Sequence, residues 1–238
     1  MIKLAVTGCL GRMGQRIVFL AIKDAEFKIS ALLERSDHPN VHETLNGIDV
    51  SSDLYSIKGC DVLIDFTSPD STIQNLKFCR DHGINMVIGT TGLVPAQIER
   101  IKEAAKDIAI VFSSNMSVGV NVLFKSVELL ARATPADYTV TMTEAHHIHK
   151  KDAPSGTAKT LAKIVEDHSS KKVHDIEAIR EGEIIGDHEV RFESAEDLIV
   201  IKHHAKTRDI FAKGALVAAK FLKGKANGFF SMQDVLGL

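Results

Sequence analysis

Cysteine is scarce in this chain, and its scarcity limits the classes of protein to consider. Cys9, Cys60 and Cys79 are an odd number among 238 residues, without the CxxC spacing of many zinc sites. This pattern disfavours a disulfide framework and a zinc knuckle. We therefore expect a protein of the reducing cytoplasm.

Long apolar runs and an excess of positive charge are missing as well. No stretch approaches the roughly 18 uninterrupted apolar residues of a membrane span, and the first residues show no signal-peptide pattern. Lys and Arg number 29 against 31 Asp and Glu, a net charge of -2, which gives no global positive field for nucleic acid. We expect neither a membrane nor a nucleic-acid partner. The 45% hydrophobic and 25% charged composition is ordinary for a globular protein long enough for two domains.

The first half of the chain alternates strand and helix patterns. Short loops between such elements predict a parallel, doubly wound, Rossmann-like α/β sheet. The expected strands are Ile2 to Thr7, Lys28 to Glu34, Asp61 to Thr67, Asn85 to Gly89 and Ile108 to Phe112, and the expected helices are Gln15 to Lys23, Ser71 to Asp81 and Pro95 to Ala105.

The pattern changes after Asn115 and predicts a second, α+β domain on a mixed, open-faced sheet. We expect a dinucleotide-binding domain at residues 1–116 plus 206–238 and a substrate-binding and oligomerisation domain at 117–205. The elements expected after Asn115 are helices at Val118 to Ala133, Gly156 to about Asp167 and Ile210 to Leu222, and strands at Tyr138 to Glu144, Ile176 to Arg180, Glu189 to Glu193 and Leu198 to Lys202.

Glycines 8, 11 and 14 form a GxxGxxG turn between the first strand and the first helix. Such a turn lets main-chain amides and a helix N-terminus hold a pyrophosphate, although tight packing alone also uses glycine there. Glu34 ends the second strand 20 positions after Gly14, where a carboxylate can accept hydrogen bonds from ribose hydroxyls. Arg35 and Arg12 could pair with the extra phosphate of NADP, so NADH and NADPH are both plausible cofactors. The alternative is a solvated charge pair at a strand end.

Two later strand ends carry small polar loops, Gly89-Thr90-Thr91-Gly92 and Ser113-Ser114-Asn115-Met116. Each is explained separately by ordinary turn chemistry. Both follow parallel strands, at the edge where α/β sheets bind ligands, which favours a nicotinamide site.

The run from Glu144 to Thr157 packs three histidines and two lysines ahead of a helix start. The segment Pro154-Ser155-Gly156-Thr157 is typical of a helix entry with exposed amides and hydroxyls. A carboxylate could dock on those amides with Lys150 as its counter-charge, so Ser155-Gly156-Thr157 is the expected anion clamp. An imidazole exchanges protons near neutral pH, so His146 or Lys150 is the candidate acid. A solvated basic loop is the alternative. His146, His147 and His149 could also be metal ligands, but their spacing does not fit a metal site, and no bound metal is expected.

Taken together, these motifs resemble the 4-hydroxy-tetrahydrodipicolinate reductase family, also called dihydrodipicolinate reductase. The resemblance covers both expected domains and the tail SMQDVLGL. It rests on GCLGRMG at 8–14, DFT at 65–67, GTTG at 89–92, SVGVN at 117–121 and the run from Glu144 to Ala158.

The resemblance implies an NAD(P)H-dependent reductase of the diaminopimelate pathway of lysine biosynthesis, usually a homotetramer, that acts on a small dicarboxylate cyclic imine. It implies His146 as acid and base, Lys150 as catalytic lysine, and substrate contacts at His147, Gly156 and Thr157 with Ser155 close by. The cofactor contacts that it implies are Gly8, Cys9, Leu10, Gly11, Arg12, Met13, Glu34, Arg35, Gly89, Thr90, Thr91, Ser113, Ser114, Asn115 and Met116.

Two other functions are compatible with a nucleotide fold. One is a catalytically idle NAD(P)H sensor or scaffold, against which the intact His146, Lys150 and Ser155-Gly156-Thr157 argue. The other is a related reductase or amino-acid dehydrogenase that acts on a different small dicarboxylate. The fold alone does not distinguish this enzyme from the reductase that the resemblance implies.

Overall fold

A computed structural model describes residues 1–238 and divides them into two compact units. The first unit comprises Met1–Ser117 and Asp209–Leu238, and the second comprises Val118–Arg208. These bounds rest on compactness, and the assignment of a cofactor or a substrate to either unit stays a prediction. No helix combines the length and the apolar composition needed to cross a membrane.

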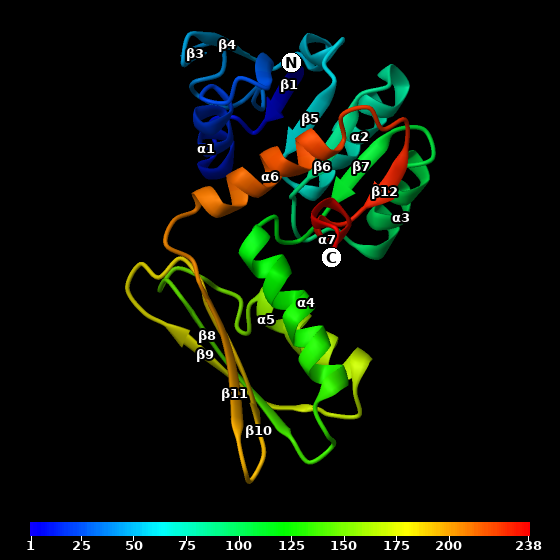
Figure 1. Cartoon of the computed structure of the whole chain (residues 1–238). Helices are drawn as coiled ribbons and strands as arrows, with labels where there is room; N and C mark the ends of the chain where they lie inside the picture. Colours follow the sequence, from blue (N-terminus) through cyan, green and yellow to red (C-terminus); the bar gives the residue numbers. More distant parts are fainter. The chain divides into compact units, whose positions relative to one another are not determined.

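The first unit contains an eight-stranded sheet with the order β12-β7-β6-β5-β1-β2-β4-β3. Its strand pairs are parallel except for the short β3–β4 hairpin. From β1 the chain moves outward through β2 and β4, and from β5 it moves outward on the other side, which confirms the doubly wound Rossmann-like sheet (Figure 1). The strands are β1 (Ile2–Thr7), β2 (Phe27–Leu33), β3 (Thr44–Leu45), β4 (Ile48–Ser51), β5 (Val62–Asp65), β6 (Asn85–Ile88), β7 (Ala109–Phe112) and β12 (Gly228–Phe230).

Helices cover both faces of this sheet. On one face α1 (Arg12–Ala21), α6 (Asp209–Phe221) and α7 (Met232–Leu236) share an apolar core with β1 and β2. On the other face α2 (Pro69–His82), α3 (Pro95–Ala104) and the 3-10 helix η1 (Leu54–Ile57) close a second core. Two buried cores on opposite faces explain why the central strands are mostly apolar instead of alternating between apolar and polar residues.

Some helix ends follow local capping signals in the sequence, and others differ from the ends expected. Ser68 caps α2 by accepting from the Ser71 amide, Pro69 occupies its first turn, and Gly83 ends it with φ 68°. In contrast, α1 begins at Arg12 and not at Gln15, because Gly11 serves as its N-cap and Gly14 lies inside its first turn. The elements β3, β4, β12 and α7 were not expected, since two- to five-residue segments carry too little periodicity to be recognised.

The second unit contains a four-stranded mixed sheet with the order β11-β10-β8-β9, as expected for the second domain. Strands β8 and β9 are parallel, and the other two pairs are antiparallel. Helices α4 (Val118–Ala133) and α5 (Gly156–His168) cover one face of this sheet (Figure 1). The opposite face is open and exposes Leu198 and Val200. The strands are β8 (Thr139–His146), β9 (Val173–Arg180), β10 (Asp187–Glu193) and β11 (Leu198–His204).

Candidate active site

The glycine turn of the first unit is held by close main-chain packing. Gly8 has φ 66°, in the left-handed region that favours glycine, and its carbonyl accepts a hydrogen bond from the Gly11 amide at 3.0 Å. A Cβ on Gly14 would lie 2.1 Å from the Gly8 carbonyl oxygen. Because the N-cap Gly11 has no side chain to cap the helix, the first-turn amides of α1 are left for an anion.

A cavity of about 630 Å³ adjoins this turn. Its volume lies within the range of small-molecule and cofactor sites. The lining comes from the ends of β1, β2 and β5, from the loops and helix that follow them, and from the segment between β4 and η1. The lining residues are Thr7, Gly8, Gly11, Leu33, Glu34, Arg35, Ser36, His38, Ser52, Leu54, Phe66, Thr67, Ser68, Ser71, Gln74 and Asn75.

Glu34 lies in this cavity, beside the glycine turn. Its carboxylate accepts hydrogen bonds from the amides of Leu10 at 3.1 Å and of Arg35 at 3.0 Å. Each carboxylate oxygen keeps further acceptor capacity for a hydroxyl. Arg35 is exposed and lies 3.4 Å from Asp37, so a carboxylate already faces its guanidinium.

Further expected cofactor residues lie in the loops after β6 and β7, while Cys9 and Leu10 lie in the glycine turn and Arg12 and Met13 open α1. Thr91 and Ser114 are exposed, whereas Cys9, Thr90 and Met116 are buried. Burial also raises the pKa of the Cys9 thiol to about 12, with the charge of Glu34 acting in the same direction. The side chains of Cys9 and Met116 are part of the apolar core, and the Thr90 hydroxyl is hydrogen-bonded to Thr67, Thr72 and Asp65, which leaves main-chain atoms as the more accessible groups of these residues.

Asp65, at the end of β5, was quoted in the DFT motif but received no role from the sequence. It is completely buried, and its oxygens accept hydrogen bonds from the Thr67 amide and hydroxyl, the Thr90 hydroxyl and the Asn75 amide group. Burial raises the pKa of Asp65, and these hydrogen bonds oppose the rise. Asp65 thus ties the loop after β5 to the loop that carries Thr90.

In the second unit, strand β8 runs two residues further than expected and includes His146. Alternation along β8 places Val140, Met142, Glu144 and His146 on its buried face. Val140 and Met142 make this face apolar where the helices cover it, and Glu144 and His146 make it polar at the end of the strand. The run from Glu144 to Thr157 therefore begins inside strand β8 and not after it.

Glu144 is the centre of the polar end of this face. Its side chain is 1% exposed, and it contacts Nδ1 of His146, the Arg180 guanidinium at 2.8 Å and the Ser155 amide at 3.2 Å. Burial raises the pKa of Glu144, but Arg180 and the charge of His146 outweigh burial and hold the pKa below its usual value. Glu144 is therefore an ionised carboxylate in a buried setting.

His188 joins this cluster from the neighbouring strand β10, where it is the register partner of Glu144. Its ring lies edge-on to that of His146, with centroids 5.2 Å apart, and its Nε2 is 3.2 Å from the Ser155 hydroxyl. Burial lowers the pKa of His188 to about 4, and the His146 charge acts in the same direction. Burial also lowers the pKa of His146, against the opposing pull of Glu144.

His147 and Lys150 lie in a turn that follows β8. The Lys150 amide bonds to the His147 carbonyl at 3.1 Å, and the Lys150 ammonium group donates to Asp152 at 2.7 Å. The hydrogen bond from Lys150 lowers the pKa of Asp152. His149 is exposed and lies 3.5 Å from Glu183, and its ring centroid is 5.9 Å from that of His147.

The expected anion clamp coincides with the start of α5. Ser155 is the N-cap, and its hydroxyl accepts from the Ala158 amide at 3.2 Å. That hydroxyl is buried, while Gly156 is exposed and Thr157 half-buried. The structure thus brings Ser155 and His146 together through Glu144, and leaves Gly156 and Thr157 as the accessible part of the clamp.

Glu144, His146 and His188 are also the residues that could share a cation, since one ligand atom from each lies within 4.8 Å of the others. This set differs from the three histidines of the sequence run. Arg180 already compensates the carboxylate charge, and Glu144 contacts His146 directly. These contacts favour a protein hydrogen-bond network over a metal centre.

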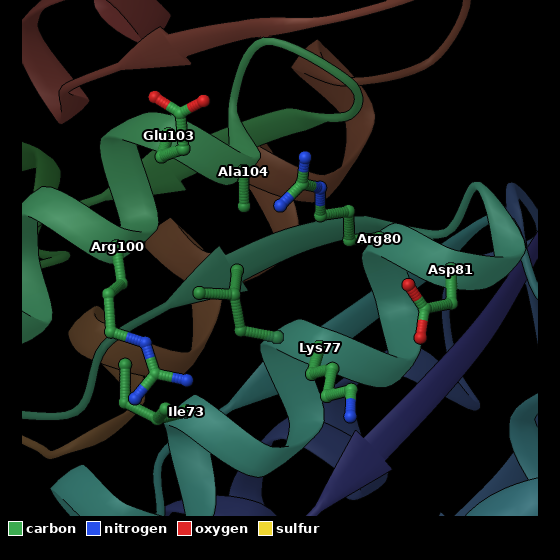
Figure 2. A pocket seen from close by; sticks show the side chains of 8 residues that line it. Ile73, Lys77, Arg80, Asp81, Arg100, Glu103 and Ala104 are labelled. Atoms are coloured by element: carbon green, nitrogen blue, oxygen red, sulfur yellow. The ribbon is translucent and has the colours of Figure 1, made fainter.

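A second hollow, of about 310 Å³, lies between α2 and α3 of the first unit (Figure 2). No residue expected in the site lines it. Its lining mixes charges of both signs over an apolar floor, and consists of Ile73, Leu76, Lys77, Arg80, Asp81, Arg100, Glu103 and Ala104.

Comparison with known families agrees with the motifs. The family model described as dihydrodipicolinate reductase, N-terminus, matches residues 2–116, and the model described as dihydrodipicolinate reductase, C-terminus, matches residues 119–236. A 4-hydroxy-tetrahydrodipicolinate reductase from Nitrosomonas eutropha is 43% identical over 100% of this chain and 99% of its own length. One from Trichlorobacter lovleyi is 40% identical over 100% of both chains.

Solved structures show the same fold. The dipicolinate-bound dihydrodipicolinate reductase from Paenisporosarcina sp. TG-14 matches with a TM-score of 0.85 at 22% identity, over 98% of each chain. An amine dehydrogenase from Mycobacterium smegmatis matches with a TM-score of 0.71 at 10% identity, over 97% of this chain and 95% of its own. At these identities the matches bear on fold alone.

Proposed function

We propose that this chain, which belongs to the dihydrodipicolinate reductase family, reduces 4-hydroxy-2,3,4,5-tetrahydrodipicolinate to 2,3,4,5-tetrahydrodipicolinate with loss of water. The observation that carries the proposal is the full-length identity of 43% and 40% to reductases of that name. The reaction is a step of the diaminopimelate pathway of lysine biosynthesis. The family and the Rossmann-like fold imply a nicotinamide cofactor.

We assign the cofactor to the first unit. Three observations fit a dinucleotide. A Cβ at position 14 would overlap the glycine turn, and the first-turn amides of α1 have no side-chain cap. Glu34 lines the adjoining cavity. When bound, NADH or NADPH supplies the hydride that adds to ring carbon four. The Glu34 carboxylate favours a ribose with free hydroxyls, while Arg35 and Arg12 favour a 2′-phosphate, so both cofactors are proposed.

We assign the substrate to the second unit. Its two carboxylates call for positive charge, which Lys150 supplies from the turn after β8, and for main-chain donors at a helix start, where Gly156 and Thr157 open α5. We propose His147, in the same turn as Lys150, as a further contact. Ser155 supports the helix start as its N-cap. Hydride addition pushes electrons of the conjugated imine toward nitrogen, so a cation near the ring stabilises the enamine that develops.

Loss of water transfers a proton from the carbon next to ring carbon four to the departing hydroxyl group, and after the hydride has added, one further proton is needed on carbon. His146 and Lys150 are the two groups that can move these protons, and we propose that both take part in catalysis. Burial lowers the pKa of His146, so that its ring gives up a proton more readily than a free imidazole, while the Lys150 side chain donates a hydrogen bond to Asp152.

The finer assignments concern assembly and compartment. We propose a homotetramer built on the open face of the four-stranded sheet, where Leu198 and Val200 are 43% and 45% exposed. We propose the cytoplasm as the compartment, consistent with three free, buried cysteines.

A single assay tests the function. Purified full-length protein should oxidise NADH or NADPH only when the product of dihydrodipicolinate synthase is supplied. A second assay, with oxidised cofactor and L-aspartate, tests for a dehydrogenase that acts on a dicarboxylate amino acid. Turnover in this second assay only would replace the proposal. Cofactor binding without turnover in either assay would indicate the sensor or scaffold function.

A further inference from the structure

Glu144 makes contacts with three different segments although it is a single side chain. Beyond its own strand, it binds the guanidinium of Arg180 from β9 and the amide of Ser155 at the cap of α5. Its remaining oxygen, Oε2, faces Nδ1 of His146 on β8. A carboxylate that is 1% exposed and held on several sides has little freedom to rotate.

Arg180 determines the charge state of this carboxylate. Its guanidinium donates to Glu144 Oε1 and also to the Asp152 carbonyl, and the pKa of Glu144 stays below its usual value because Arg180 and His146 outweigh burial. An ionised carboxylate only accepts hydrogen bonds. The neutral imidazole of His146 must therefore carry its hydrogen on Nδ1.

The other ring nitrogen of His146 is left for chemistry. A Cβ on Gly186 would lie 3.1 Å from Nε2, so the glycine keeps that side of the ring uncrowded. His188 stands edge-on to the ring at 5.2 Å and limits its rotation. Nδ1 lies against Glu144 Oε2, and neither of these two buried atoms has another partner, so Nε2 is the ring nitrogen that can contact a substrate.

We propose that Glu144 is the positioning residue of the reductase: it fixes the orientation and tautomer of His146 so that Nε2 exchanges the proton with the substrate. The inference rests on the proposed function, in which His146 is an acid and base. A carboxylate does the same for the histidine of Ser-His-Asp triads, where it orients the ring and selects the tautomer. The same carboxylate also holds the Ser155 amide, which links the acid to the start of the anion clamp.

Glu144→Gln tests the proposal because it keeps the shape and removes the charge. We expect kcat to fall on the order of 100-fold, the scale of general acid-base catalysis, with a much smaller change in KM. Glu177→Gln is the matched control, because Glu177 is exposed on β9 of the same sheet and bonds only weakly to Thr143. It should retain the wild-type kcat.

The pH profile separates positioning from a merely structural role. The charged and titratable groups that face His146 are Glu144, Arg180, Lys150 and His188. Glu144 alone raises the pKa of His146, while burial, Lys150 and Arg180 lower it. Without the Glu144 charge that pKa falls, so the alkaline limb of kcat, where the acid loses its proton, should move to lower pH. A Glu144→Gln enzyme with wild-type kcat and an unmoved limb overturns the proposal.

A second measurement does not need an active enzyme. Nitrogen NMR of the wild-type chain, above the pKa of His146, should show Nδ1 protonated and Nε2 bare. The signal is assigned by its absence in His146→Gln. A ring protonated on Nε2 refutes the positioning role even if the enzyme reduces its substrate. Failure of the wild type to reduce the synthase product refutes the proposed function instead, and leaves the NMR result to decide the geometry of Glu144.

Discussion

The Lys150 ammonium group donates a hydrogen bond to the Asp152 carboxylate across 2.7 Å, within one turn after β8. Lys150 is about three-quarters buried, with a side chain 23% exposed, whereas Asp152 is 51% exposed. The carboxylate therefore restrains a lysine that would otherwise sample many rotamers. An incoming substrate carboxylate would find the ammonium group already in place.

Lys150→Ala should lower kcat by on the order of 100-fold or more, because it removes the fixed cation proposed to stabilise the developing enamine. The dissociation constant for NADH, measured by fluorescence titration, should stay near that of the wild type, since the cofactor is assigned to the other unit. Lys163→Ala is the control, because Lys163 pairs with Asp167 on the exposed side of α5. An unchanged kcat would remove Lys150 from the chemistry.

Glu34→Ala should weaken NADH binding roughly tenfold or more, the cost of losing hydrogen bonds to a charged acceptor. NADPH binding should weaken less, because the lost carboxylate would also have repelled the 2′-phosphate. Asp49→Ala on β4 provides the control, since Asp49 is exposed and lies outside the cavity lining. Equal NADH affinities in wild type and Glu34→Ala would rule out the ribose contact.

Gly14→Ala should destabilise the first unit, because the new Cβ would lie 2.1 Å from the Gly8 carbonyl oxygen. Overpacking of this kind costs about 1–3 kcal/mol, and each kcal/mol lowers the Tm of a chain of this size by roughly 2–4 °C. Gly156→Ala is the comparison for Tm, since a Cβ there meets nothing within 4 Å. Calorimetry that finds both variants equal to the wild type would contradict the close approach.

Stability should depend on pH through His188. Burial lowers its pKa to about 4 in the folded chain, against about 6.5 when unfolded. Above pH 6.5 neither state binds this proton, and as pH falls from 6.5 to 4 only the unfolded state does, so stability is lost over that window. The loss is about 3 kcal/mol for this group. In His188→Gln, urea titrations at pH 7 and pH 4.5 should show a smaller difference than in the wild type; an identical difference would show that His188 is not buried as a neutral ring.

The sequence was sufficient for the α/β class and for most elements. Strands such as Ile2–Thr7 and helices such as Val118–Ala133 have the bounds expected, because burial on a sheet or helix face leaves a regular apolar period in the sequence. The glycine turn was also readable, since a left-handed Gly8 and a side-chain-free Gly14 leave glycine as the residue that fits.

Glu144 marks the limit of what the sequence offered. Its spacing of two from His146 on one strand already placed both side chains on the same face, and that signal could have revealed the pair. Arg180 and His188 carried no such signal. They reach Glu144 only through the register of β8 with β9 and β10.

The sequence by itself determined the fold class, the glycine turn and the dense run of proton-active groups, because these depend on short-range periodicity and on residue types close together in the chain. The tertiary structure alone decided which of those groups are available for chemistry. It buried Thr90, Met116 and the Ser155 hydroxyl, and it gathered Glu144, Arg180 and His188 around His146. The physical reason is that strand pairing joins residues far apart in the chain, and burial and charge at the resulting positions set the protonation and orientation of each side chain.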